Sequence, residues 1–97
     1  MSAYVTLFNF TEQGVRTAKD TVKLIRAFAK SVESAGGQFI GVWWLLGAYD
    51  GVVIFEAPDD ETATRLLLSI GMQGNARTTT MRAFSEDEMQ RIVQGLP

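Results

Sequence analysis

The sequence contains no histidine and no cysteine. Histidine is the commonest general base and the commonest metal ligand, so a Ser-His-Asp triad, a His-ligated zinc and a His-ligated haem cannot be built from this chain alone. Without cysteine there is no disulfide framework and no thiolate chemistry. We therefore expect no cofactor and no metal, and the lack of cysteine fits a cytoplasmic location.

A basic excess is missing too, because nine Lys and Arg residues face eleven Asp and Glu residues, for a net charge of −2. Dedicated binders of nucleic acids or membrane surfaces carry a basic excess, so we expect neither partner. No run approaches the roughly 18–20 apolar residues of a membrane span. The start, Met1–Val5, lacks the features of a signal peptide, which again favours the cytoplasm.

The chain is short but rich in hydrophobic residues. Of its 97 residues, 46% are hydrophobic, and two are tryptophan. A chain of this size forms one domain, and small domains bury only about 60–65% of their unfolded surface. This composition favours a partner that covers part of the apolar surface.

Apolar periodicity predicts the secondary structure. Strands are predicted at Tyr4–Phe10, Gln38–Leu46, Gly51–Ala57 and Ala76–Phe84. One helix is predicted to begin at Asp20 and end at Gly36-Gly37, and a second to run from Asp59 or Asp60 to Gly71. Ser85 and Glu88 form a capping box before a last helix.

This order of elements predicts a single α+β domain over residues 1–97, a ferredoxin-like βαββαβ sheet plus a C-terminal helix. Right-handed crossovers place both long helices on one face of the sheet. The second strand is apolar on both faces: Phe39, Trp43 and Leu45 are predicted to point one way, and Ile40, Val42, Trp44 and Leu46 the other.

An antiparallel sheet with a solvated face alternates apolar and polar residues, so the second face needs a cover. A partner sheet or the last helix can supply it. Because that helix is short and single, we expect sheet-on-sheet association into a homodimer or a higher homo-oligomer.

Four segments carry a resemblance to a known family. They are Tyr4–Thr11, Gly47-Ala48-Tyr49-Asp50, Glu56–Asp60 and Asn75–Phe84, and they span nearly the whole chain. Together they resemble the GYD domain family of bacteria and archaea. The resemblance implies the dimeric α/β-barrel superfamily, in which two ferredoxin-like sheets pair face to face. That superfamily includes cofactor-free monooxygenases, isomerases and haem-handling enzymes, but the haem-handling branches generally need an axial histidine, which is absent here.

The turn Gly47-Ala48-Tyr49-Asp50-Gly51 carries the candidate catalytic residues, Tyr49 and Asp50. A phenol beside a carboxylate can orient or deprotonate a phenolic or enolic substrate. In the alternative interpretation, Asp50 accepts backbone hydrogen bonds within the turn and Tyr49 packs its ring at the sheet edge.

Two neighbouring tryptophans and an asparagine are candidate ligand-binding residues. Trp43 and Trp44 must face opposite sides of their strand, and each either packs in the core or interface or lines a cavity. Asn9 either holds a substrate oxygen or hydrogen-bonds the turn that follows its strand.

Arg82 is the remaining candidate ligand-binding residue. An inward-facing arginine needs an anionic ligand, a partner backbone or a structural carboxylate, for which Glu56 is the candidate. The basic stripe Lys19, Lys23, Arg26 and Lys30 is interpreted as a solvated helix face rather than a nucleic-acid footprint.

Two functions remain open from the sequence. The first is a homodimer that binds a small apolar or aromatic molecule between sheet and helices or at the dimer seam, with monooxygenase-type or isomerase-type chemistry if it is catalytic. The alternative is a non-catalytic effector-binding or structural dimerisation module. Whether the protein is an enzyme is not decided by these residues.

Overall fold

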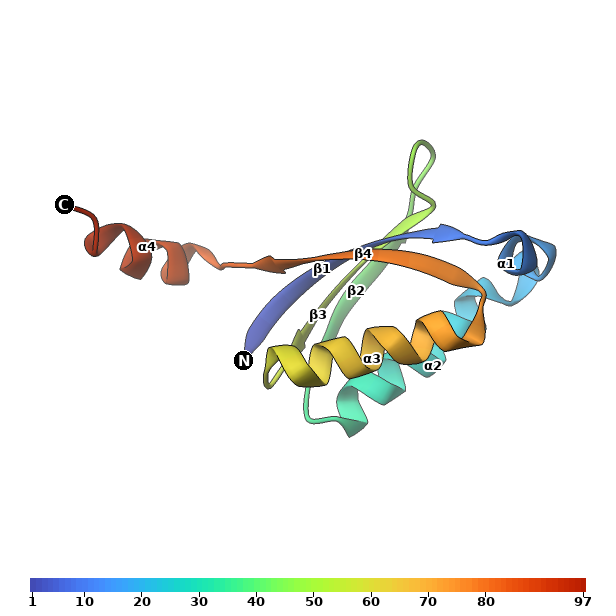
Figure 1. Cartoon of the computed structure of the whole chain (residues 1–97), viewed down its shortest axis with the longest axis horizontal. Helices are drawn as coiled ribbons and strands as arrows, with labels where there is room; N and C mark the ends of the chain where they lie inside the picture. The colour runs from blue at the N-terminus through green and yellow to red at the C-terminus, as the bar shows by residue number, and fades with distance from the viewer.

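Four antiparallel strands form one sheet in the order β2-β3-β1-β4 in a computed structural model that describes residues 1–97. Two long helices, α2 and α3, cover one face of it (Figure 1). This confirms the predicted ferredoxin-like α+β fold. The elements are β1 (Ser2–Phe10), α1 (Glu12–Arg16), the 3-10 turn η1 (Ala18–Asp20), α2 (Thr21–Ser34), β2 (Gln38–Trp44), β3 (Gly51–Ala57), α3 (Asp60–Gln73), β4 (Ala76–Ala83) and α4 (Glu86–Gln94).

The core lies between the sheet and these two helices. Its centre is Phe55 of β3, which is fully buried. The ring of Phe55 stacks on Tyr4 of β1 at 5.3 Å between centroids and meets Phe28 of α2 edge-on at 5.5 Å. Val32 of α2 and Leu66 of α3 complete this layer. Alternate residues of β1 and β3 therefore face the helices, as the period of a half-buried strand requires.

One predicted helix boundary and one predicted helix cap need correction. The second long helix continues past Gly71 to Gln73 and ends at Gly74, whose φ of 79° is the left-handed conformation that glycine adopts most readily. At the other helix, Asp20 does precede α2, but its side chain makes no capping hydrogen bond. The turn η1 leads directly into α2 and takes the place of a side-chain cap.

A short helix, α1, occupies the segment that the sequence predicted only as a break. Thr11 caps it, because its Oγ1 accepts a hydrogen bond from the Gly14 N–H at 3.0 Å. Gly14 lies so close to the carbonyl of Asn75 that a Cβ there would stand 1.9 Å from that oxygen. Glycine is thus required by a close approach, and α1 closes one end of the space between sheet and helices.

A bulge in β2 changes which of its residues face the helices. The register shifts between Phe39 and Gly41, so Phe39 pairs with Phe55 while Val42 pairs with Val53. Both Phe39 and Val42 therefore point toward the helices. The prediction that they face opposite ways was wrong, because one extra residue reverses the alternation. Past the bulge, Trp43 lies on the other, open face of the sheet.

The last helix, α4, extends away from the rest of the molecule (Figure 1). It has the predicted capping box, in which Ser85 Oγ accepts from the Glu88 N–H at 3.1 Å and Glu88 Oε1 accepts from the Ser85 N–H at 2.9 Å. None of its residues is buried. The second face of the sheet is consequently uncovered in the single chain. No helix combines the length and the apolar composition that crossing a membrane requires.

Candidate functional site

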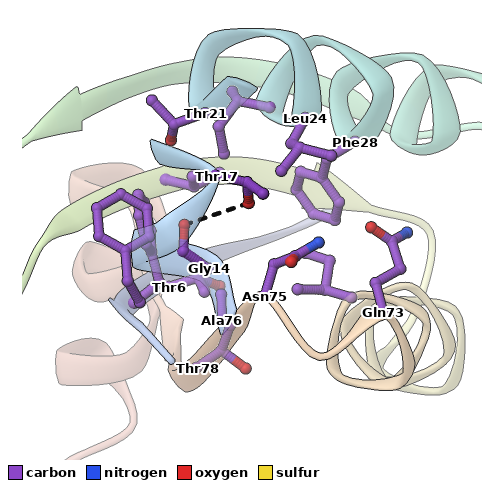
Figure 2. A pocket seen from close by; sticks show the side chains of 15 residues that line it. Thr6, Gly14, Thr17, Thr21, Leu24, Phe28, Gln73, Asn75, Ala76 and Thr78 are labelled. Atoms are coloured by element: carbon purple, nitrogen blue, oxygen red, sulfur yellow. Dashed lines mark hydrogen bonds between the residues drawn. The ribbon is translucent and has the colours of Figure 1, made fainter. Parts of the chain in front are cut away.

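A cavity of about 70 Å³ lies between the sheet and the helices, at the end of the core that α1 closes (Figure 2). Strands β1 and β4, helices α1 and α2, and the end of α3 all contribute to it. Its lining is Thr6, Phe8, Phe10, Gly14, Thr17, Thr21, Leu24, Ile25, Phe28, Val53, Ile70, Gln73, Asn75, Ala76 and Thr78. The volume suits a compact molecule of a few heavy atoms, because a single water needs about 10–15 Å³ on this measure.

The polar groups of the cavity are mostly hydroxyls, and some of them are already paired. The hydroxyl of the buried Thr6 lies 2.9 Å from that of Thr80. Thr21 Oγ1 accepts a hydrogen bond from the indole of Trp44 at 3.0 Å. Thr17 Oγ1 donates a long bond of 3.4 Å to the carbonyl of Gly14, drawn in Figure 2.

No ionisable side chain lines the cavity. General acid-base catalysis needs a titratable group within hydrogen-bond reach of the reacting proton. The lining is therefore suited to binding an uncharged, mainly apolar molecule rather than to moving a proton.

The loop between β2 and β3 holds Tyr49 and Asp50 outside this cavity. Asp50 Oδ2 accepts a hydrogen bond from the Phe10 N–H at 2.8 Å, and the Asp50 N–H donates to the carbonyl of Phe8 at 2.9 Å. Asn9 Nδ2 donates to the carbonyl of Ala48 at 3.0 Å. Asp50 and Asn9 thus fasten the loop to the end of β1. Tyr49 is 39% exposed. A catalytic role for Tyr49 and Asp50 stays a prediction.

The two tryptophans lie on opposite faces of the sheet, as predicted. Trp43 is 55% exposed on the open face, and its ring lies over Gly41, where an added Cβ would stand 3.1 Å from the indole. Trp44 lies on the helix side, but at the rim between β2 and α2 rather than in the core. Neither ring lines the cavity.

Arg82 lies at the opposite end of the sheet from the loop. Its guanidinium donates to Ser2 Oγ at 2.7 Å and lies 3.9 Å from Asp60 Oδ1. The predicted structural ion pair of Arg82 is confirmed, but its partner is Asp60 and not the expected Glu56. Glu56 pairs with Ala3 and so faces the open side of the sheet, whereas Arg82 pairs with Tyr4 and faces the helix side.

Tyr4 completes this cluster, because its hydroxyl donates to Asp60 Oδ1 at 2.5 Å. Burial raises the pKa of Tyr4 above its ordinary value, and the hydrogen bond to Asp60 raises it further. A phenol that holds its proton more tightly is a poor general base at neutral pH. The Tyr4, Asp60 and Arg82 side chains therefore fasten α3 to the sheet.

The six residues predicted as a site do not converge. Asn9 and Asp50 lie at one end of β1, and Arg82 lies beside Tyr4, five residues or about 16 Å along the strand. The threonines of the cavity were not among the residues predicted from the sequence. Their signal was present, because Thr6, Thr78 and Thr80 are polar residues at inward-facing strand positions.

The topology and the two covering helices define this chain as a ferredoxin-like α+β domain. The GYD domain profile matches residues 4–93, and the chain belongs to the GYD domain family.

Several known proteins are similar to this chain. A protein of Thermus thermophilus, called glutamine synthetase and cystathionine beta-lyase binding protein, is 27% identical over 85 residues, which cover 87% of this chain and 90% of that protein.

The crystal structure of TTHA0845, also from Thermus thermophilus, has a TM-score of 0.54 at 20% identity, covering 88% of this chain and 95% of that one. The crystal structure of MtbAldR has a TM-score of 0.70 at 16% identity. That match covers 88% of this chain but only 52% of MtbAldR, so this chain spans about half its length. At these identities the structural matches show a shared fold.

Proposed function

We propose that this chain is a homodimeric protein-binding module in which the open sheet faces of two copies pack together. The observation that carries the proposal is the apolar character of that face. Its central residues are Val5, Leu7, Trp43, Val52, Ile54 and Met81, which the strand registers place side by side.

The exposure of these side chains supports the pairing. Trp43 is 55% exposed and Met81 is 45% exposed in the single chain. A contiguous apolar face of this kind marks an interaction surface, since scattered apolar residues would need no cover. A second copy presents the same face, and two identical faces related by a two-fold axis are self-complementary.

The similarity to the Thermus protein supports the choice of proteins as further partners. That protein is named for binding two enzymes, and the match extends over most of both chains. A paired-sheet dimer would leave α2 and α3 on its outer surfaces. Their solvated faces would then be available to another protein.

Sedimentation velocity of the full chain tests the pairing. Ile54→Asp places a charge at the centre of the open face and should convert a dimer into a monomer. The matched control is Leu68→Asp, because Leu68 is 63% exposed on α3 and lies outside the proposed interface. A wild-type protein that is monomeric at micromolar concentration would contradict the proposal, as would an Ile54→Asp variant that stays dimeric.

The cavity supports a second function, the binding of a small apolar or aromatic molecule. Its mainly apolar wall and its threonine hydroxyls match a compact uncharged ligand with one polar group. No acid or base lines the cavity. Turnover of such a ligand by monooxygenase-type or isomerase-type chemistry would therefore require Tyr49 or Asp50, which lie outside the cavity, to reach the ligand.

Titration with phenol and indole tests the second function. We expect binding by the wild type and none by Thr78→Phe, which fills the cavity, while Thr79→Phe on the opposite face of β4 should bind as the wild type does. Equal response of all three proteins, or of none, would exclude the cavity as the binding site.

A further inference from the structure

Helix α4 has almost nothing to pack against in its own chain. It is nine residues long, and no part of the fold makes extensive contact with it. An isolated helix shorter than about 12–15 residues is marginal in water, even with good caps. The capping box alone therefore does not account for a stable α4, and a docking surface is required.

One side of α4 is built for such a surface. Met89, Ile92 and Val93 follow the helical spacing of a single apolar stripe, which Leu96 extends two residues past the end of α4 at Gln94. Each of the four side chains is between 43% and 66% exposed. The opposite side is polar. The first turn is acidic, with Glu86, Asp87 and Glu88 against only Arg91 later in the helix.

An apolar groove lies at the far edge of the sheet, between α2 and the edge strand β2. Its lining is Val22, Ile25, Phe39, Ile40, Val42 and Trp44, together with Gly41 and Arg26. Val22 is 55% exposed and Ile40 is 50% exposed, so the groove is open to a further apolar element. We refer to it as the edge groove.

The charges around the edge groove complement those of α4. The segment from Lys19 to Glu33 holds four basic residues against two acidic ones, and Arg26 lies in the groove itself. Helix α4 holds three acidic residues against one basic residue. The hydrogen bond from the Ser85 N–H lowers the pKa of the Glu88 carboxylate below its ordinary value, which favours its charged form.

The helix cannot reach the edge groove of its own chain. Helix α4 follows β4, and β4 and β2 are the two opposite edges of the sheet. Three strand spacings separate them, or about 14 Å, whereas the link Phe84-Ser85 carries the chain from Ala83 to Glu86 over at most about 10–11 Å. Figure 1 shows α4 directed away from its own sheet.

We infer that the apolar side of α4 docks in the edge groove of a second copy, and that two copies exchange these helices reciprocally. This inference rests on the proposed sheet pairing. A two-fold axis parallel to the strands lays β4 of one copy over β2 of the other at the roughly 10 Å spacing of packed sheets, which brings the partner's edge groove nearer to each α4 than the groove of its own chain. The exchanged helices then close the seam of the dimer on both sides.

Hydrogen exchange of the full chain, followed by mass spectrometry and paired with sedimentation velocity, tests this inference. In the dimer the backbone amides of α4 should exchange at least about tenfold more slowly than in the monomer obtained by dilution or by Ile54→Asp. Ile40→Glu should remove that protection while the sheets stay paired. Leu68→Glu, an equally drastic change outside the groove, should leave it in place.

Each other outcome overturns the inference. A dimer with unprotected α4 would leave the sheet pairing intact and refute the docking alone. Protection that persists in Ile40→Glu would place α4 on another surface, and protection that persists in the monomer would place it on its own chain. A wild type that is monomeric throughout would refute the sheet pairing and the docking together.

Discussion

The two faces of the sheet are made from the same strands, but only the helix side is buried within the single chain. On the helix side Phe55, Val53 and Tyr4 are buried, and the side chains there find partners within one chain. On the open side their sequence neighbours Ile54, Val52 and Val5 are only partly covered. The single chain therefore completes one core and leaves the other face open, which is the face that the proposed pairing with a second copy would cover.

The largest effect should separate the two faces directly. Phe55→Ala should lower the free energy of unfolding by about 3–5 kcal/mol, because it removes a fully buried ring from the centre of the core. Ile54→Ala, one residue away on the open face, should cost much less at concentrations where the protein is monomeric and more as the dimer forms. Urea unfolding at two protein concentrations measures both variants. Equal losses at all concentrations would erase the distinction between the faces.

The loop that joins β2 to β3 gives the next effect. Asp50→Ala removes the carboxylate that accepts the Phe10 N–H, and hydrogen bonds to charged groups are worth about 1.5–3 kcal/mol. Asp50→Asn retains an acceptor and should lose less. Thermal unfolding measures the two losses. If Asp50→Ala unfolds like the wild type, Asp50 does not anchor the loop. The catalytic alternative would then be favoured over the structural one.

Tyr4→Phe tests the contact between β1 and the start of α3. Loss of the hydroxyl that donates to Asp60 should cost about 0.5–1.5 kcal/mol at neutral pH, less than the full value of a hydrogen bond to a charged group, because the Asp60 side chain is 78% exposed and screened by solvent. Because the folded state raises the pKa of Tyr4, its contribution is complete below the ordinary pKa of about 10 and is lost as the pH rises through the folded value. The difference in the free energy of unfolding between the wild type and Tyr4→Phe should therefore become smaller at alkaline pH, as urea unfolding at several pH values can measure. A difference that widens instead would contradict this assignment.

The smallest effect should appear at α4. Ser85→Ala removes the capping box and should cost about 0.5–2 kcal/mol of local helix stability. At concentrations where the protein is monomeric, global unfolding should barely change, because α4 has no buried residue in its own chain. Circular dichroism and the exchange rates of the α4 amides measure the change. A large drop in the unfolding midpoint would show that α4 belongs to the main core.

Local patterns were enough to predict the fold. Alternation located all four strands, and the spacing around Ser85 and Glu88 located the last helix, because both signals lie within a few neighbouring residues. Helix α1 escaped prediction, since Gly14 disfavours a helix and is required only by the approach of Asn75, which is distant in the sequence. The bulge at Ile40 has no local signal and reversed the predicted faces of Phe39 and Val42.

The candidate site was less accessible to prediction. A cavity is the space left where several elements fail to fill the volume between them, and no spacing in one element specifies it. Arg82 shows the same limit, because its carboxylate partner is Asp60 at the start of α3 rather than a residue on a neighbouring strand. The predicted catalytic and ligand-binding roles of the six site residues remain to be tested.

Fluorescence of Trp43 tests the central claim, that a second copy covers the open face. In a Trp44→Phe variant, Trp43 is the only indole, and it lies exposed on the open face of the single chain. At micromolar concentration we expect a blue-shifted emission maximum that moves to the red when Ile54→Asp is added to the same variant. An emission maximum equal to that of the urea-unfolded chain in both proteins would contradict it.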